Sequence, residues 1–138
     1  MRVITPSEIR LILRSIPPHS PFGARDRAML ILLLHTGLRV SEICGLVVAD
    51  VVQWSAPRKM LDLPAHLGKG GYARLIPLNA SAREAVSILM RFNQARGFSI
   101  APEAPLLVTR RGTALPVRTF QHLVQRYREA AGLSPRIT

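Results

Sequence analysis

An arginine and a glutamate lie one helical turn apart, immediately after a predicted helix break. Gly37 ends an apolar segment, Arg39 opens the next helix, and Glu42 follows three residues later. A guanidinium at such a corner lies near the exposed N–H groups of a helix start, so the corner is a candidate anion-binding site. Glu42 is spaced to hold Arg39 in one orientation. The spacing alone favours an ordinary surface ion pair, which contributes little to stability.

A second candidate is a lysine in a glycine-rich turn. Lys69 stands between Gly68 and Gly70, and Gly71 follows. Glycines supply the positive φ angles of tight turns. The chain uses 17 arginines but only two lysines. Because a lysine can release a proton and an arginine effectively cannot, Lys69 is suited to proton transfer. The alternative is a solvated turn lysine.

Helices and short strands are predicted around these residues. Apolar side chains at helical spacing, a capping box from Thr5 to Glu8 and glycine or proline breaks define the segments. A helix capped by Asn79 or Ser81 runs to about Arg96. The other predicted helices are residues 6–16, 22–36, 40–46 and 117–131, and the predicted strands are residues 47–54, 60–65 and 73–78. The fold class is therefore mainly α with a small three-stranded antiparallel β-sheet, an α+β arrangement.

The charge of the chain is strongly positive. It has 19 basic and 8 acidic residues, a net charge of +11. A small domain this basic usually meets a polyanion, and we predict double-stranded DNA as the partner. RNA recognition by a sheet would need exposed aromatic side chains, but aromatic residues make up only 5%. No membrane partner is expected, because the longest apolar run, Ala28 to Leu34, is too short to cross a bilayer.

The cysteine and the histidines do not suggest a further reactive or metal-binding site. Cys44 is the only cysteine, so it has no internal disulfide partner, which fits a reducing, cytosolic compartment. Its apolar neighbours predict a small core residue rather than a reactive thiol. The histidines are isolated, without the spacing of a ligand cluster. They are His19, His35, His66 and His122. We expect neither a metal nor a cofactor.

Three segments together resemble tyrosine recombinases of the phage-integrase family. Residues 36–46, TGLRVSEICGL, match the family's first box, T-G-L-R-x-S-E-(two residues)-G-L, without departure. Residues 68–78, GKGGYARLIPL, resemble its β-hairpin, often G-K-G-x-K-x-R-x-(V/I)-P-L, with Tyr72 where many members have Lys or Arg. Residues 106–112, LLVTRRG, resemble L-F-x-(S/T)-R-x-G more loosely. The resemblance covers nearly the whole chain from Thr5 onward.

The resemblance implies a role for each matched residue. Arg39 is the first of the family's two catalytic arginines, Glu42 is the acidic residue beside it, and Lys69 is the general acid that protonates the leaving 5′-oxygen. The family's tyrosine attacks a DNA phosphodiester, which gives a 3′-phosphotyrosyl link and a free 5′-hydroxyl without a metal. Fixed guanidinium groups stabilise the negative charge of the transition state. The predicted DNA-contacting residues are Lys69, Arg74, Arg110, Arg111 and Arg118.

The nucleophile of the family has no match in the sequence. The family continues with His-x-x-Arg, a His or Trp, and then the tyrosine, but none of the four histidines has an arginine three residues on. Tyr72 and Tyr127, the only tyrosines, do not stand in the nucleophile's context, and Tyr127 is predicted to lie in the core. We therefore expect residues 1–138 to be a partial catalytic domain, inactive on its own.

Two functions follow from the sequence. The first is site-specific DNA recombination or integration, by a bacterial, phage or mobile-element enzyme that the resemblance implies assembles as a tetramer on DNA. The part present here is expected to be monomeric and cytoplasmic. The alternative is a non-catalytic DNA-binding module that kept the fold and lost the chemistry.

Overall fold

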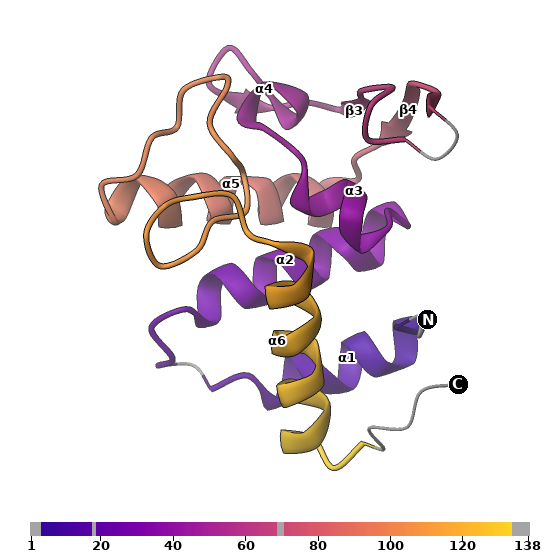
Figure 1. Cartoon of the computed structure of the whole chain (residues 1–138), viewed down its shortest axis with the longest axis vertical. Coiled ribbons are helices and arrows are strands. Elements are labelled where there is room, and N and C mark those ends of the chain that lie inside the picture. The colour runs from indigo at the N-terminus through magenta and orange to yellow at the C-terminus, as the bar shows by residue number, and fades with distance from the viewer. Residues whose placement is uncertain (1–3, 18, 69–70, 134–138) are drawn as a thin grey trace.

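The computed structural model describes residues 4–17, 19–68 and 71–133. Helices dominate, and short strands follow the first four of them (Figure 1). The helices are α1 (Pro6–Ser15), α2 (Gly23–Thr36), α3 (Val40–Cys44), α4 (Val48–Val51), α5 (Ala80–Ala95) and α6 (Val117–Ala130). The strands are β1 (Val52–Gln53), β2 (Ala56–Pro57), β3 (Met60–Leu63) and β4 (Arg74–Pro77).

The helix boundaries follow local capping chemistry. Thr5 Oγ1 accepts the Glu8 N–H at 3.2 Å and Glu8 Oε1 accepts the Thr5 N–H at 3.1 Å, which confirms the predicted capping box. Asn79, rather than Ser81, caps α5, because its Oδ1 accepts the Ala82 N–H at 2.9 Å. The predicted long helices are therefore confirmed to within a residue or two at each end.

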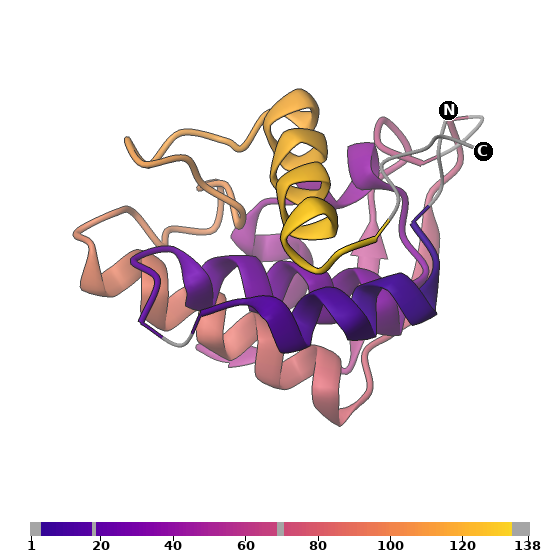
Figure 2. The same ribbon diagram turned by 90° about the horizontal axis from the view of Figure 1, so that it is seen from below.

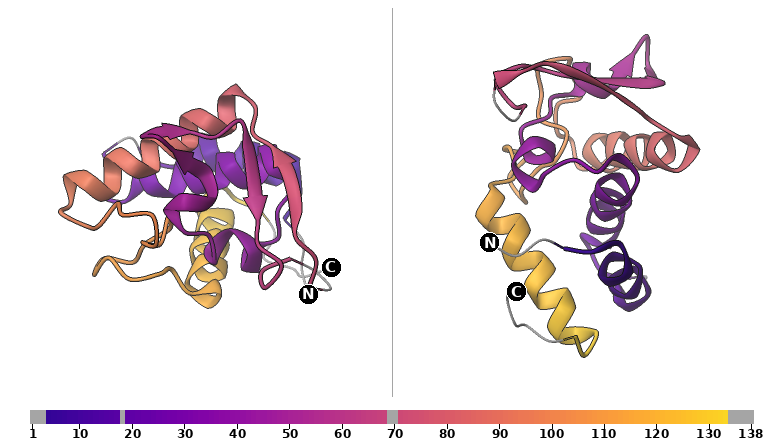
Figure 3. Two further views of the ribbon diagram at one scale, coloured as in Figure 1. Left: turned by 90° about the horizontal axis from the view of Figure 1, so that it is seen from above. Right: turned by 90° about the vertical axis from the view of Figure 1, so that its right-hand side faces the viewer.

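The core is built around α2. Its side chains Met29, Leu30 and Leu32 are fully buried, as expected for a helix that is apolar on all sides. The helices α1, α2 and α5 form one layer with α2 in the middle, which is clear where they are seen end-on (Figure 3, right). Helix α6 crosses one face of this layer (Figure 2) and buries Phe120 and Val124 against it. The segments between the helices are attached to this packed layer.

The predicted three-stranded sheet is wrong in its connectivity. The structure has two separate two-stranded antiparallel sheets, β1 with β2 and β3 with β4. Residues 48–51, predicted as strand, form the helical turn α4, because Asp50 Oδ2 accepts the Val47 N–H at 2.9 Å and caps its start. Trp54 and Ser55 then adopt positive φ angles of 52° and 63° in a two-residue hairpin turn. This turn pairs β1 with β2 instead of with β3.

None of the described helices is long and apolar enough to cross a membrane.

Candidate active site

The corner between α2 and α3 places Arg39. Thr36 Oγ1 donates to the Leu32 carbonyl at 2.7 Å and accepts the Leu38 N–H at 3.3 Å, so the last turn of α2 is closed by a side chain. Gly37 adopts a left-handed φ of 69°, which favours glycine. Leu38 is then buried in the core, and the next residue, Arg39, is exposed to solvent. The corner fixes the Arg39 backbone and leaves its side chain accessible.

Glu42 links Arg39 to the hairpin. Its side chain is 1% exposed, and Oε1 accepts both the Arg39 main-chain N–H at 2.9 Å and the Arg74 guanidinium at 3.0 Å. The sequence led us to expect Glu42 to orient the Arg39 guanidinium. In the described part of the chain, Glu42 instead accepts a hydrogen bond from the Arg39 main chain and forms an ion pair with Arg74. One buried carboxylate therefore couples the corner to the first residue of β4.

The hairpin packs directly on α3. A Cβ at Gly45 would lie 2.4 Å from Leu67 Cδ2, so glycine permits Leu67 to approach the end of α3. A Cβ at Gly68 would lie 2.2 Å from the Tyr72 carbonyl oxygen, so glycine also permits the hairpin loop to close. Lys69 itself lies outside the described residues. On either side of it in the sequence, Leu67 approaches Gly45 at the end of α3 and Arg74 pairs with Glu42 in α3.

The other predicted DNA-contacting arginines lie in two places. Arg118 is exposed in the first turn of α6, a helix that packs against α3. Arg110 and Arg111 are exposed in the turn closed by hydrogen bonds between Thr109 and Thr113.

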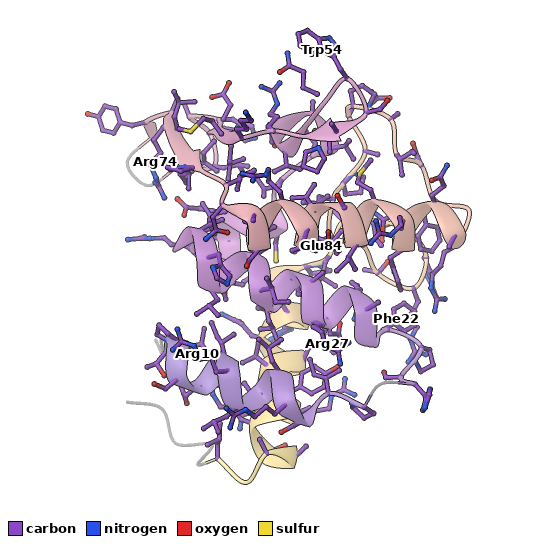
Figure 4. The ribbon with its side chains drawn as sticks, turned by 180° about the vertical axis from the view of Figure 1, so that it is seen from behind. Arg10, Phe22, Arg27, Trp54, Arg74 and Glu84 are labelled. Atoms are coloured by element: carbon purple, nitrogen blue, oxygen red, sulfur yellow. The ribbon has the colours of Figure 1, made fainter. Side chains whose placement is uncertain are left out.

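The turn that carries Arg110 lies far from Arg39 along α2. The Arg110 guanidinium carbon is 5.5 Å from the centre of the Phe22 ring, at the start of α2. Arg39 and Arg74 lie beyond the opposite end of this helix, and Figure 4 shows Phe22 and Arg74 at opposite ends. Because α2 has 14 residues, its two ends are about 20 Å apart.

A buried network that sequence reasoning missed ties α6 to α2. The Asp26 carboxylate pairs with the Arg25 guanidinium at 2.7 Å and accepts a hydrogen bond from the Tyr127 hydroxyl. Arg25 Nη1 also donates to the Val108 carbonyl at 3.0 Å. The sequence did contain a signal for this network: Arg25 and Asp26 are adjacent charged residues on a helix predicted to be buried, and buried charges need partners.

Burial favours the neutral forms of Tyr127 and Cys44. Burial, together with the hydrogen bond to Asp26, raises the pKa of Tyr127, so its hydroxyl stays protonated and serves the core, as predicted. Tyr72 is 75% exposed on the hairpin. Burial raises the pKa of the Cys44 thiol to about 12, which fits the predicted small core residue. Among the described residues, no group of three or more His, Cys, Asp or Glu could hold a metal ion.

Comparison with known proteins decides the family. The sequence pattern of the phage integrase family matches residues 2–138. The chain belongs to the phage integrase family. It is 28% identical over 132 residues to the tyrosine recombinase XerD of Ralstonia nicotianae, an alignment that covers 96% of this chain and 41% of that protein. It is 36% identical over 142 residues to the tyrosine recombinase XerC of Roseiflexus castenholzii, with 96% and 41% covered. This phage integrase family chain thus spans about two fifths of the length of these relatives.

Solved structures of other recombinases share the fold of this phage integrase family chain. The crystal structure of XerA recombinase matches with a TM-score of 0.69 and 18% identity, and covers 100% of this chain and 46% of that one. The lambda integrase catalytic core matches with a TM-score of 0.68 and 20% identity, and covers 97% and 75%. The mainly helical fold with two small sheets is therefore that of integrase catalytic cores.

Proposed function

We propose that this chain is part of the catalytic domain of a tyrosine recombinase, and that it supplies Arg39 and Lys69 to DNA strand cleavage and rejoining. The observation that carries the proposal is the TGLRVSEICGL segment, which folds as a corner with Arg39 exposed and Glu42 buried behind it. Residues 1–138 are then a partial catalytic domain, which fits their alignment with 41% of the XerD relative. Site-specific recombination or integration is the activity of the complete enzyme.

The proposed chemistry assigns charge stabilisation to Arg39. When a tyrosine oxygen attacks the DNA phosphorus, the P–O bond to the 5′-oxygen breaks and negative charge develops on the non-bridging oxygens. A guanidinium fixed in advance stabilises this charge at no reorganisation cost. The α2–α3 corner fixes the main chain from which this guanidinium extends, since the Arg39 N–H is bound to Glu42 and the preceding Leu38 is buried.

The proposed role of Lys69 is to protonate the leaving 5′-oxygen. This role needs an ammonium close to Arg39, and the hairpin that bears Lys69 packs on α3 through Leu67 and Gly45. The Arg74–Glu42 ion pair holds the other strand of the hairpin to the same helix. Arg74 is then both a DNA contact and an anchor of the hairpin.

The proposed partner is double-stranded DNA. Related structures are described as a lambda integrase tetramer bound to a Holliday junction and as XerH bound to its palindromic difH substrate. By this likeness the complete enzyme would assemble as a tetramer on DNA, and the present chain alone would be a monomer. Lys69, Arg74, Arg110, Arg111 and Arg118 are the proposed DNA contacts.

DNA binding by this chain is expected to have little sequence preference and a steep salt dependence. Backbone contacts give affinity without base information, and each neutralised phosphate releases counterions. The logarithm of the binding constant should therefore fall linearly with the logarithm of the salt concentration. Fluorescence anisotropy with two duplexes of unrelated sequence tests this, and binding that is insensitive to salt, or absent at low salt, contradicts a DNA-binding role.

The 138-residue chain alone is expected to form no covalent link to DNA. Its tyrosines do not match the family's nucleophile, and the Tyr127 hydroxyl is bound to Asp26 with a raised pKa. A suicide substrate, in which the cleaved strand diffuses away, should yield no protein–DNA adduct on a denaturing gel. An adduct that mass spectrometry maps to Tyr72 or Tyr127 would overturn the assignment of an absent nucleophile.

A further inference from the structure

Arginines surround the ring of Phe22, just before the start of α2. The guanidinium carbon of Arg96 is 4.2 Å from the ring centre, that of Arg25 is 4.7 Å away and that of Arg110 is 5.5 Å away. The ring also packs against Phe92, with a centroid distance of 5.7 Å. Three segments distant in the sequence, from α2, the end of α5 and the loop before α6, therefore meet at one aromatic platform.

Two of these arginines remain available to a ligand. Arg25 is buried and paired with Asp26 at 2.7 Å, so its charge is already offset. Arg96 and Arg110 are exposed, and neither has an acidic partner among the described ion pairs. Arg96 donates one hydrogen bond to the Pro21 carbonyl at 2.9 Å. Stacking on a ring restricts a guanidinium while leaving other N–H groups at its edge free to donate.

A phosphodiester is the ligand that this arrangement fits. Exposed arginines held in fixed positions recognise phosphate oxygens through paired N–H donors. Stacking of a nucleic-acid base on Phe22 is not expected, because the half-buried ring is already flanked by Phe92 and the guanidinium groups. Backbone phosphate contact is therefore the favoured mode.

The position of the cluster makes it distinct from the Arg39 corner. The two lie at opposite ends of α2, a helix of 14 residues whose ends are about 20 Å apart. Along a B-form duplex this length corresponds to about six base pairs at 3.4 Å each. A duplex that runs along α2 would span both places, which is the arrangement that the proposal requires.

We propose that Phe22, Arg96 and Arg110 form a second phosphate-binding site. It would bind the DNA backbone about half a turn of the duplex away from the site of cleavage. The inference rests on the proposed DNA-binding function and deepens it. Phe22 acts as a positioning residue, because it aligns the guanidinium groups without touching DNA.

The test compares the salt dependence of DNA binding between single variants of the 138-residue chain. Arg96→Gln and Arg110→Gln should each lower the slope of log K against log salt by about 0.9 and weaken binding about five- to tenfold at 0.1 M salt. Arg91→Gln is the matched control. Arg91 is exposed on α5, the helix that ends just before Arg96. Its ion pair with Glu84 is long, at 3.6 Å, and it is not one of the arginines that stack on Phe22. It should leave the slope unchanged.

A fourth variant separates alignment from charge. Phe22→Leu keeps both arginines, so the slope should stay that of the parent while binding weakens about two- to fivefold, the value of a lost cation–π contact. Circular dichroism confirms that each variant is folded. If the parent binds DNA but Arg96→Gln behaves like Arg91→Gln, the second site is refuted and the proposed function stands. If the parent binds no DNA at low salt, the proposed function itself fails.

Discussion

Replacing Arg39 by alanine is expected to slow DNA cleavage by about 10³-fold in an enzyme that includes this domain and supplies the nucleophile. The variant removes a preorganised positive charge from the non-bridging oxygens of the transition state. The fold should survive, because the Arg39 side chain is exposed and the hydrogen bond to Glu42 comes from its main chain. Single-turnover cleavage of a labelled suicide substrate measures the loss.

Lys69→Ala should also slow cleavage, and a modified substrate separates the two roles. A bridging thiolate at the 5′ position leaves without a proton, so it should restore cleavage by Lys69→Ala, whose proposed defect is in protonation. It should not restore Arg39→Ala, since the charge on the non-bridging oxygens is the same for both substrates. Rescue of neither variant, or of both equally, refutes Lys69 as the general acid.

The part of the site that was predictable from sequence is the part made by local chemistry. The α2–α3 corner depends on Thr36, Gly37 and Glu42, which act on the backbone within a few residues. The caps at Thr5 and Asn79 were readable for the same reason. Such contacts are fixed by residue type and spacing, so one sequence contains all the information that they need.

The contacts that sequence reasoning missed join residues far apart in the chain. Arg74 pairs with Glu42 across 32 positions, and Arg25 reaches the Val108 carbonyl across 83 positions. Spacing along the chain carries no signal of either contact. The mistaken part of the predicted strand, residues 48–51, had a different cause, because its valines fit a strand as well as the buried side of the turn α4. There the capping of Val47 by Asp50 outweighed β propensity.

Loss of the buried Asp26 carboxylate is expected to destabilise the fold more than any surface substitution. Asp26→Ala leaves the guanidinium of Arg25, a residue that is 5% exposed, without its acidic partner at 2.7 Å. An uncompensated buried charge costs about 3–5 kcal/mol. The matched control is Glu84→Ala, which breaks an exposed ion pair of 3.6 Å with Arg91 and should cost less than about 1 kcal/mol. Urea denaturation at pH 7 measures both.

The hydroxyl of Tyr127 gives the same network a pH dependence. Its folded pKa is raised above the ordinary value of 10.0, first by burial and then by the hydrogen bond to Asp26. The stability that the protonated hydroxyl contributes is therefore fully present below pH 10 and is lost as the pH rises through the folded pKa. The difference in unfolding free energy between the parent chain and Tyr127→Phe should be constant from pH 7 to 9 and shrink above about pH 10.

The network also joins α6 to α2, because Asp26 is on α2 and Tyr127 is on α6. Asp26→Ala should speed amide hydrogen exchange in α6, which carries Arg118, while exchange in α5 stays slow in the folded state. The double variant Arg25→Met/Asp26→Leu removes both charges, so it should unfold at a higher urea concentration than Asp26→Ala. A double variant no more stable than Asp26→Ala would show that the lost packing, and not the stranded guanidinium, causes the destabilisation.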